Sequence, residues 1–203
     1  MAIIPIPARL PLRGLKWRCP EPAIVNRSGW TGTSKVVGLP GAGVWSASGE
    51  FSVIVGEGNV LRWRAFFTAL RGQRNSFCLI AIERARQTET IGVTVRAGAG
   101  NADTLPLQGM PAGGRVLLGG ELMTVPLPSG HHRLVCLTQD LVADANGEGV
   151  ARFGPELGEI PTAGTLVELR TPYAQVRQTS EPPGWDVGLG QTYTFPFSVE
   201  EAK

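Results

Sequence analysis

The side chains best suited to chemistry in this sequence are two adjacent histidines. His131 and His132 are the only histidines among the 203 residues, and Ser129 lies shortly before them. An imidazole can serve as a general base or as a metal ligand. Neighbouring residues of a strand point to opposite faces, however, so this pair is poorly placed to bind one metal ion. A Ser–His pair also needs a geometry that closeness in a turn does not supply. We therefore interpret both histidines as solvated turn residues.

Oxygen-bearing side chains alternate at Asp144, Asn146 and Glu148, a pattern that suggests calcium. An EF-hand loop needs about twelve residues, a terminal Glu and flanking helices, and this segment has none of these features. A hairpin tip explains it better, and Asn146-Gly147 predicts a type I′ turn because both residues tolerate a positive φ. The remaining loop carboxylates show no pairing typical of glycosidases: Asp103, Asp140, Glu156 and Glu159.

Other catalytic and cofactor motifs are missing from the sequence. Residues 98–103, GAGNAD, are not followed by the Lys-Ser/Thr of a phosphate loop, and no GxSxG elbow occurs. Cys19, Cys78 and Cys136 are odd in number and widely spaced, which predicts reduced, buried thiols, with Cys78 in a buried strand. We predict no catalytic residue, no metal site and no cofactor.

The composition is that of a folded, turn-rich chain. Hydrophobic residues make up 42% and charged residues 18%, while 27 Gly and 16 Pro are scattered along the sequence. These values favour a mainly β protein. The net charge of +2 gives no nucleic-acid signature. No apolar stretch reaches the roughly 20 residues of a membrane span, and the N-terminus lacks the charged start of a signal peptide, so we expect a soluble, unprocessed chain made in a cytoplasm.

One strong helix is predicted over residues 57–72, with Asn59 as its N-cap and Gly72 as its stop. Large apolar side chains recur there at helical spacing, which places them on one face that must pack on a sheet. This predicted face consists of Val60, Trp63, Phe66, Phe67 and Leu70.

Strands are predicted on both sides of the helix and at the chain's end. Residues 44–55 alternate loosely, with a predicted apolar face of Val44, Phe51, Val53 and Val55. Residues 77–82 form a more continuous apolar run, typical of a buried strand. Near the C-terminus strict alternation predicts a closing strand whose apolar face is Tyr193, Phe195, Phe197 and Val199. Pro196 suggests an edge strand or an unpaired N–H there.

The middle of the chain indicates a second all-β unit. Residues 88–170 lack a helical period, and their short apolar runs are separated by turns at a spacing of about 8–12 residues, typical of a small barrel or sandwich. The Gly-rich segment 98–100 marks a flexible entry. We predict one domain made of residues 1–90 and 171–203, and an inserted domain made of residues 91–170.

Three blocks of the sequence resemble, in the same order, the distal tail protein family of long-tailed bacteriophages. They are GAGVWSASGEFSVIVGEGNVLRWRAFFTALRGQRNSFCL at 41–79, ADANGEGVARFGPEL at 143–157 and GWDVGLGQTYTFPFSVEEA at 184–202. The resemblance covers most of the chain and rests on packing and turn patterns. It is therefore a resemblance of architecture and carries no catalytic signature.

This resemblance implies a structural role in the virion. Members of the family have a tube-type β-sandwich or barrel domain with one packed helix, which assembles as a hexameric ring around the DNA channel. The ring joins the tail tube protein to the baseplate or tip hub proteins, and DNA passes through its lumen without specific binding. An OB-like β domain is sometimes inserted, which here corresponds to residues 91–170 and is a candidate for contact with host glycans.

Three alternatives remain open at this stage. The chain could be another minor tail or tube protein. It could be a carbohydrate-binding β module in which Trp30, Trp45 and Trp185 stack on sugars. A hydrolytic tail-tip enzyme is disfavoured because the sequence has no histidine or carboxylate constellation. The assembly state separates the ring from the sugar-binding module.

Overall fold

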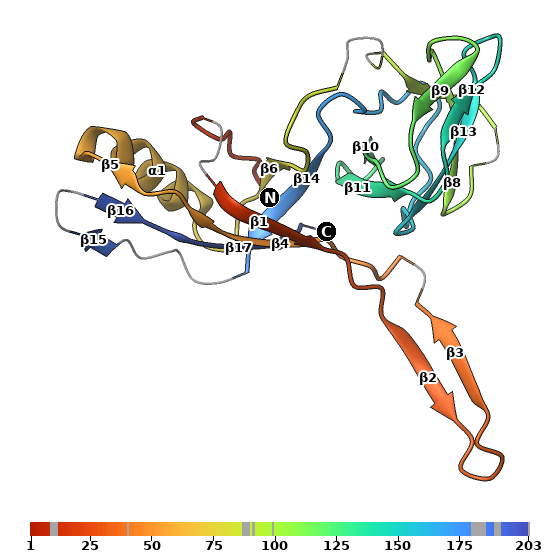
Figure 1. The fold of residues 1–203 in the computed structure, drawn as a ribbon, viewed down its shortest axis with the longest axis horizontal. Coiled ribbons are helices and arrows are strands. Elements are labelled where there is room, and N and C mark those ends of the chain that lie inside the picture. The colour runs from red at the N-terminus through yellow and green to blue at the C-terminus, as the bar shows by residue number, and fades with distance from the viewer. Residues whose placement is uncertain are drawn as a thin grey trace. The chain divides into compact units, whose positions relative to one another are not determined.

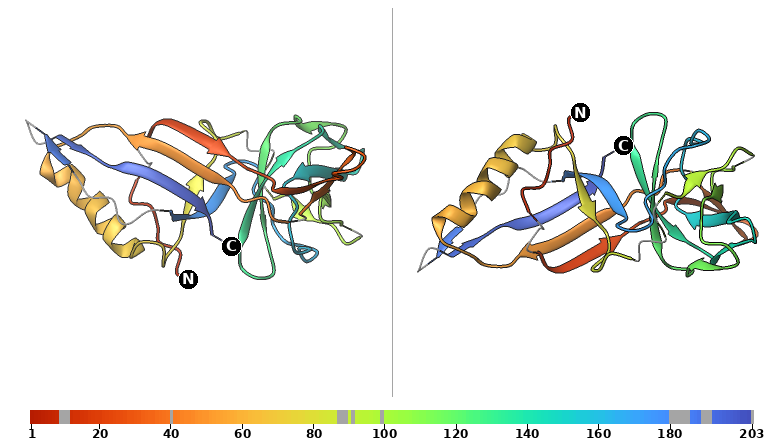
Figure 2. Two further views of the ribbon diagram at one scale, coloured as in Figure 1. Left: turned by 90° about the horizontal axis from the view of Figure 1, so that it is seen from below. Right: turned by 90° about the horizontal axis from the view of Figure 1, so that it is seen from above.

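The structure, a computed structural model, describes residues 1–8, 12–39, 41–86, 90, 92–98, 100–179, 186–188 and 192–202. Across these residues the chain is mainly β with a single α-helix (Figures 1 and 2), which confirms the fold class predicted from the composition. The chain divides into two compact units. Unit 1 comprises 1–18, 45–79 and 174–203, and unit 2 comprises 19–44 and 80–173.

Unit 1 is built on two sheets and the helix. The order of strands in the larger sheet is β1 (Leu12–Arg18), β4 (Ser46–Phe51), β17 (Pro196–Glu201), β14 (Tyr173–Gln178) and β6 (Phe77–Ile80). The order in the smaller sheet is β15 (Asp186–Gly188), β16 (Thr192–Thr194) and β5 (Ile54–Val55). Strands from the beginning and the end of the chain therefore lie side by side, since β17 pairs antiparallel with β4.

Helix α1 spans Glu57–Leu70, and its buried residues are the five of the predicted apolar face, Val60, Trp63, Phe66, Phe67 and Leu70. The predicted caps are wrong. The N-cap is Gly56, whereas Asn59 lies within the first turn, where its Nδ2 donates to Val55 O at 2.9 Å. The helix ends because Arg71 adopts a left-handed conformation with a φ of 49°.

Phe51 is the centre of an aromatic cluster between the helix and the sheet. Its ring lies 5.5 Å from Trp63 and 5.6 Å from Phe67 on the helix, measured between centroids. From the closing strands it meets Phe195 at 5.7 Å and Phe197 at 5.8 Å. All four are edge-on contacts, the arrangement that aromatic quadrupoles favour. All four residues of the predicted closing face, Tyr193, Phe195, Phe197 and Val199, are buried.

Two details of the strands differ from the sequence prediction. The chain breaks its alternation between β4 and β5, so Ile54 points inward while Val53 and Val55 are 53% and 61% exposed. The predicted apolar face of residues 44–55 is therefore wrong beyond Phe51. Strand β17 is also internal to its sheet, so the edge-strand prediction is wrong; Pro196 is its first residue, where a missing N–H is tolerated.

Unit 2 contains a closed barrel. The order of its main sheet is β10 (Leu122–Pro126), β11 (His132–Leu137), β13 (Gly149–Gly154), β8 (Thr104–Gln108) and β7 (Thr94–Val95). Residues 164–169 connect the two edge strands of this sheet, β7 and β10. Val167 N donates to Val93 O, just before β7, at 2.9 Å, and Glu168 N donates to Thr124 O of β10 at 2.9 Å. A separate pair, β9 (Gly114–Leu117) and β12 (Leu141–Ala143), lies beside it. The enclosed core is apolar and includes Leu107, Met123, Val135 and Phe153.

The compact units divide the chain at different points from the predicted domains. The predicted boundaries lie at 90/91 and 170/171, whereas the units divide at 79/80 and 173/174. Residues 19–44, expected in the first domain, group with unit 2. This segment contains a hairpin that the sequence analysis did not predict, made of β2 (Ala23–Arg27) and β3 (Ser34–Gly38).

We predict that Trp63→Ala lowers the free energy of unfolding by about 3–5 kcal/mol, because it removes a large aromatic from the Phe51 cluster. Leu61→Ala is the matched control on the same helix, since Leu61 is 51% exposed and should lose far less. Calorimetric or urea unfolding of both variants measures the difference. Equal loss in the two variants would contradict the assigned packing face.

Candidate functional site

The most unusual surface of the molecule is the β2–β3 hairpin, which we call the arm (residues 22–39). Its strands pair with each other and with no other described strand (Figure 1). Every residue of both strands is exposed. Its tip is closed by local bonds: Ser28 Oγ accepts from Thr31 N at 3.2 Å, and Thr31 and Thr33 share a hydroxyl bond of 2.7 Å. The arm is thus an ordered but uncovered element.

Both faces of the arm are apolar. The antiparallel register places Val25 opposite Val36 on one face and Ile24 opposite Val37 on the other. The exposed large hydrophobics of the arm are Ile24, Val25, Trp30, Val36, Val37 and Leu39, with exposed fractions from 41% to 97%. An isolated two-stranded hairpin is at best marginally stable in water. Exposed apolar side chains gathered on one element are frequent at protein interaction sites, so the arm is a candidate interface.

A buried arginine holds the base of the arm. Arg133 lies in β11 with no exposed surface, and its Nη2 donates to Gly43 O at 2.6 Å and to Glu156 O at 3.2 Å. A Cβ at Gly43 would lie only 2.8 Å from Pro155 Cβ, so the backbone there packs directly on the barrel. A buried guanidinium is tolerated only where it is hydrogen-bonded. The position after the arm is therefore fixed by the barrel.

His132 is not a solvated turn residue, and that interpretation is corrected. It is the first residue of β11, is half-buried, and its Nδ1 lies 2.6 Å from the hydroxyl of Tyr173, a residue 41 positions further on. Burial, and secondarily the charge of His131, lower the pKa of His132. Sequence spacing gives no sign of this pairing, because strand topology alone brings Tyr173 to it.

The Asp144 turn is a hairpin tip, with a different geometry from the predicted one. Asp144 Oδ1 accepts from Asn146 N at 2.8 Å and from Glu148 N at 2.9 Å, and these bonds lower the pKa of its carboxyl. Asn146 does not adopt a positive φ, so the type I′ prediction is wrong. Gly147 alone is left-handed, with a φ of 74°, and a side chain there would collide with Met110 O. Glu148 also pairs with Arg96.

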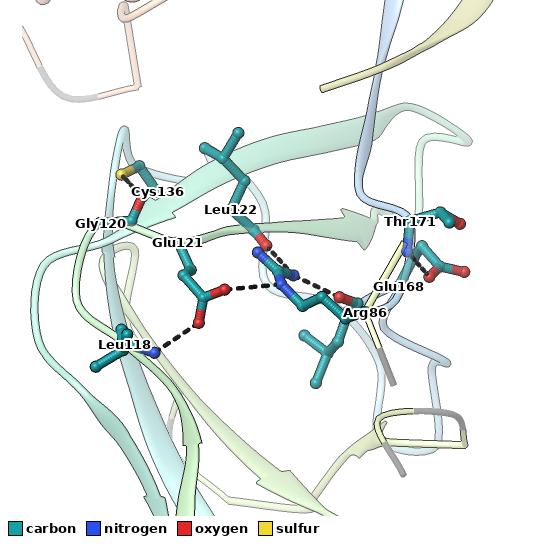
Figure 3. Close-up of polar contacts among 9 residues, drawn as sticks. Arg86, Leu118, Gly120, Glu121, Leu122, Cys136, Glu168 and Thr171 are labelled. Atoms are coloured by element: carbon teal, nitrogen blue, oxygen red, sulfur yellow. Dashed lines mark hydrogen bonds and ion pairs between the residues drawn. The ribbon is translucent and has the colours of Figure 1, made fainter. Parts of the chain in front are cut away.

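Figure 3 shows a second polar cluster, around Arg86, which sequence reasoning missed. Its Nε donates to Glu121 Oε1 at 2.9 Å, and its Nη1 donates to the carbonyls of Leu122, at 2.8 Å, and Leu169. Glu121 uses its other oxygen to accept from Leu118 N at 2.7 Å. The guanidinium therefore ties β10 to the segment that closes the barrel. We interpret the cluster as a structural link between these two segments, without a catalytic role.

The thiols and tryptophans also have defined places. Cys19, Cys78 and Cys136 are half-buried thiols, and burial raises the pKa of the Cys78 and Cys136 thiols, which makes these two poor nucleophiles. Of the three predicted sugar-stacking residues, Trp45 is buried against Trp17, Trp30 is 97% exposed at the arm's tip, and Trp185 lies outside the described residues.

Within the described part of the chain, no group of three or more metal-ligating side chains comes together.

Comparison of the sequence with protein-family models gives no match, and comparison with curated proteins gives none either. None of the helices that the structure describes is long and apolar enough to span a bilayer.

Replacing Arg133 by Met should loosen the base of the arm. The change leaves the carbonyls of Gly43 and Glu156 without this donor, and an unsatisfied buried group costs about 1–3 kcal/mol. Hydrogen exchange of the amides at 41–44 should accelerate about tenfold or more. Arg152→Met, an exposed arginine of β13, is the control. Unchanged exchange at 41–44 in Arg133→Met would refute the anchoring role.

The His132 environment predicts a pH dependence of stability. Its pKa is lowered on folding, so the unfolded chain binds the proton more tightly and stability is lost as pH falls through the unfolded value of about 6.5. His132→Gln removes this loss. The melting temperature of the wild type should therefore fall relative to that of His132→Gln between pH 7.5 and 5.5. A difference that stays constant with pH would contradict the assignment.

Proposed function

We propose that the protein is a structural subunit of a bacteriophage tail that forms a hexameric ring at the distal end of the tail tube. In this role it connects the tail tube protein to the baseplate or tip hub, and DNA passes through the lumen without specific binding. The single observation that carries the proposal is the arm, whose two apolar faces are exposed in the isolated chain.

Self-association explains the arm better than a small ligand does. A hydrophobic side chain gains about 1.5–3 kcal/mol when it is fully buried, and the arm offers several that the chain itself leaves exposed. An arm that docks on a different surface of another copy makes a heterologous contact. Heterologous contacts generate rings when the rotation closes.

The rest of unit 1 suits a rigid ring subunit. The Phe51 cluster locks the helix to the sheet, and the resemblance of residues 41–79 and 184–202 to the distal tail family covers this same unit. The small net charge of +2 fits a lumen that binds DNA weakly. The ring would place the protein in the virion, after synthesis in the host cytoplasm.

A second candidate function is glycan binding through Trp30. This side chain is 97% exposed, and Thr31 and Thr33 supply hydroxyls in the same hairpin tip; an aromatic face and polar groups are what a sugar site requires. The carbohydrate-binding alternative therefore concentrates on the arm's tip rather than on the barrel.

Imaging by negative stain with mass photometry tests the ring. The purified chain, alone or with its tube neighbour, should form closed rings, and Val25→Ser with Val36→Ser should reduce it to monomers. Val142→Ser with Val150→Ser removes two similarly exposed valines of unit 2 and should leave the rings intact. A wild type that stays monomeric under both conditions would refute the proposal. Glycan-array binding abolished by Trp30→Ala would favour the second candidate.

A further inference from the structure

The tip of the arm, residues 27–35, carries positive charge that the chain does not neutralise. The whole arm contains two bases, Arg27 and Lys35, and no Asp or Glu. Both bases are exposed, and neither has an ion-pair partner among the described residues. Several partly exposed arginines elsewhere in the described chain do pair with carboxylates. The two bases of the tip are therefore open to an anion from outside the chain.

The strand register places the two bases at the same level of the arm. Lys35 is paired with Asn26, and Arg27 is paired with Ser34, so the bases occupy adjacent positions of the ladder. Adjacent positions point to opposite faces of a β ribbon. One base therefore lies on each face, just behind the turn, and an anion that approaches the tip from either face meets a positive charge.

The turn between the bases presents an uncovered aromatic ring. Trp30 is 97% exposed and makes no ring contact or hydrogen bond with any described residue. Trp45, by contrast, is buried against Trp17. Both faces of the Trp30 indole and its N–H are thus available. The negative face of an aromatic ring attracts the positively polarised C–H groups of a sugar, and the indole N–H can donate to a sugar oxygen.

The composition of the tip favours a saccharide over a lipid surface or a nucleic acid. Residues 27–35 contain four hydroxyl side chains and two glycines, and Trp30 is their single large apolar residue. An element that enters a bilayer needs a larger apolar face, and burying these hydroxyls there would be costly. A single-stranded nucleic acid is bound on successive aromatic platforms, whereas the tip has one. Hydroxyls, one aromatic ring and cationic groups together match an acidic sugar.

We propose that the tip of the arm binds an acidic saccharide, whose sugar ring stacks on Trp30 and whose carboxylate or phosphate group meets Arg27 or Lys35. This inference rests on the glycan-binding candidate and names its ligand class. It is compatible with the proposed ring, because the subunit contact uses the apolar pairs behind the tip. The site is open to solvent, so single-site binding is weak and sensitive to salt. Several arms on one ring would bind a polymer with much greater avidity.

Paired polymers that differ in charge test this site. The probes are polygalacturonate with its neutral methyl ester, for the carboxylate, and phosphomannan with dephosphorylated mannan, for the phosphate. The wild type should bind at least one charged polymer about tenfold or more tightly than its neutral partner, because the charge-assisted bonds are lost with the charge. Raising the salt concentration should shrink this preference. The pair that shows it identifies the anionic group.

Variants of the tip separate the two parts of the site. Arg27→Gln with Lys35→Gln should abolish the preference for the charged polymer. Trp30→Ala should weaken binding of both polymers about tenfold, while Trp30→Phe, which keeps an aromatic face, should retain most of it. Arg84→Gln with Arg152→Gln removes two exposed bases outside the arm and should leave binding unchanged. Melting temperatures and mass photometry check that every variant keeps the fold and assembly state of the wild type.

The possible outcomes distinguish this inference from the functions on which it builds. Equal binding of charged and neutral polymers, or a preference that survives in Arg27→Gln with Lys35→Gln, would overturn the acidic ligand and leave the glycan-binding candidate. Equally tight binding of polyglutamate, phosphatidylglycerol vesicles or single-stranded DNA would overturn the saccharide class. Loss of rings in Trp30→Ala would assign the tip to the subunit contact instead. A wild type that binds none of the four polysaccharides would overturn both this site and the glycan-binding candidate, while the proposed ring would stand.

Discussion

The packing of α1 on the sheet through Phe51 is the interaction on which unit 1 depends. Its ring meets Trp63 and Phe67 from the helix and Phe195 and Phe197 from the end of the chain. Its N–H also donates to Phe195 O at 3.3 Å. One residue of β4 thus joins the helix that follows it to residues near the end of the chain. Removing such a group leaves a cavity that stiff aromatic neighbours fill poorly.

The same sheet explains how a second unit can be inserted. Strands β6 and β14 are neighbours, so the chain leaves one strand and returns on the next. The hydrogen bond from Ala81 N to Pro172 O, at 2.8 Å, continues this closeness beyond the strands. The inserted barrel then leaves no open edge between β7 and β10, because residues 164–169 bond to both. Arg86, which follows β6 in the sequence, stabilises this closure by donating hydrogen bonds to the carbonyls of Leu122 and Leu169.

Features governed by local periodicity could be read from the sequence. The spacing of Val60, Trp63 and Phe67 and the alternation of Tyr193 and Phe195 required no knowledge of the rest of the chain, and the composition indicated a mainly β fold. Contacts set by topology could not be read. Arg133 reaches Gly43 across 90 residues, and Tyr173 meets His132 across 41. The arm was missed because Pro22 and several glycines obscure two short strands. Its signal was the pair of valine-containing runs, 23–27 and 34–38, around a Gly-rich tip.

The conformational entropy of the arm gives a physical reason for the fixed position of its base. A freely moving hairpin would lose conformational freedom on docking, and that loss subtracts from the binding free energy. The buried bond from Arg133 to Gly43 O and the close packing of Gly43 on Pro155 remove much of that freedom before any partner arrives. In the proposed assembly the arm is therefore held on a preorganised base, so that ordering subtracts less from its binding free energy.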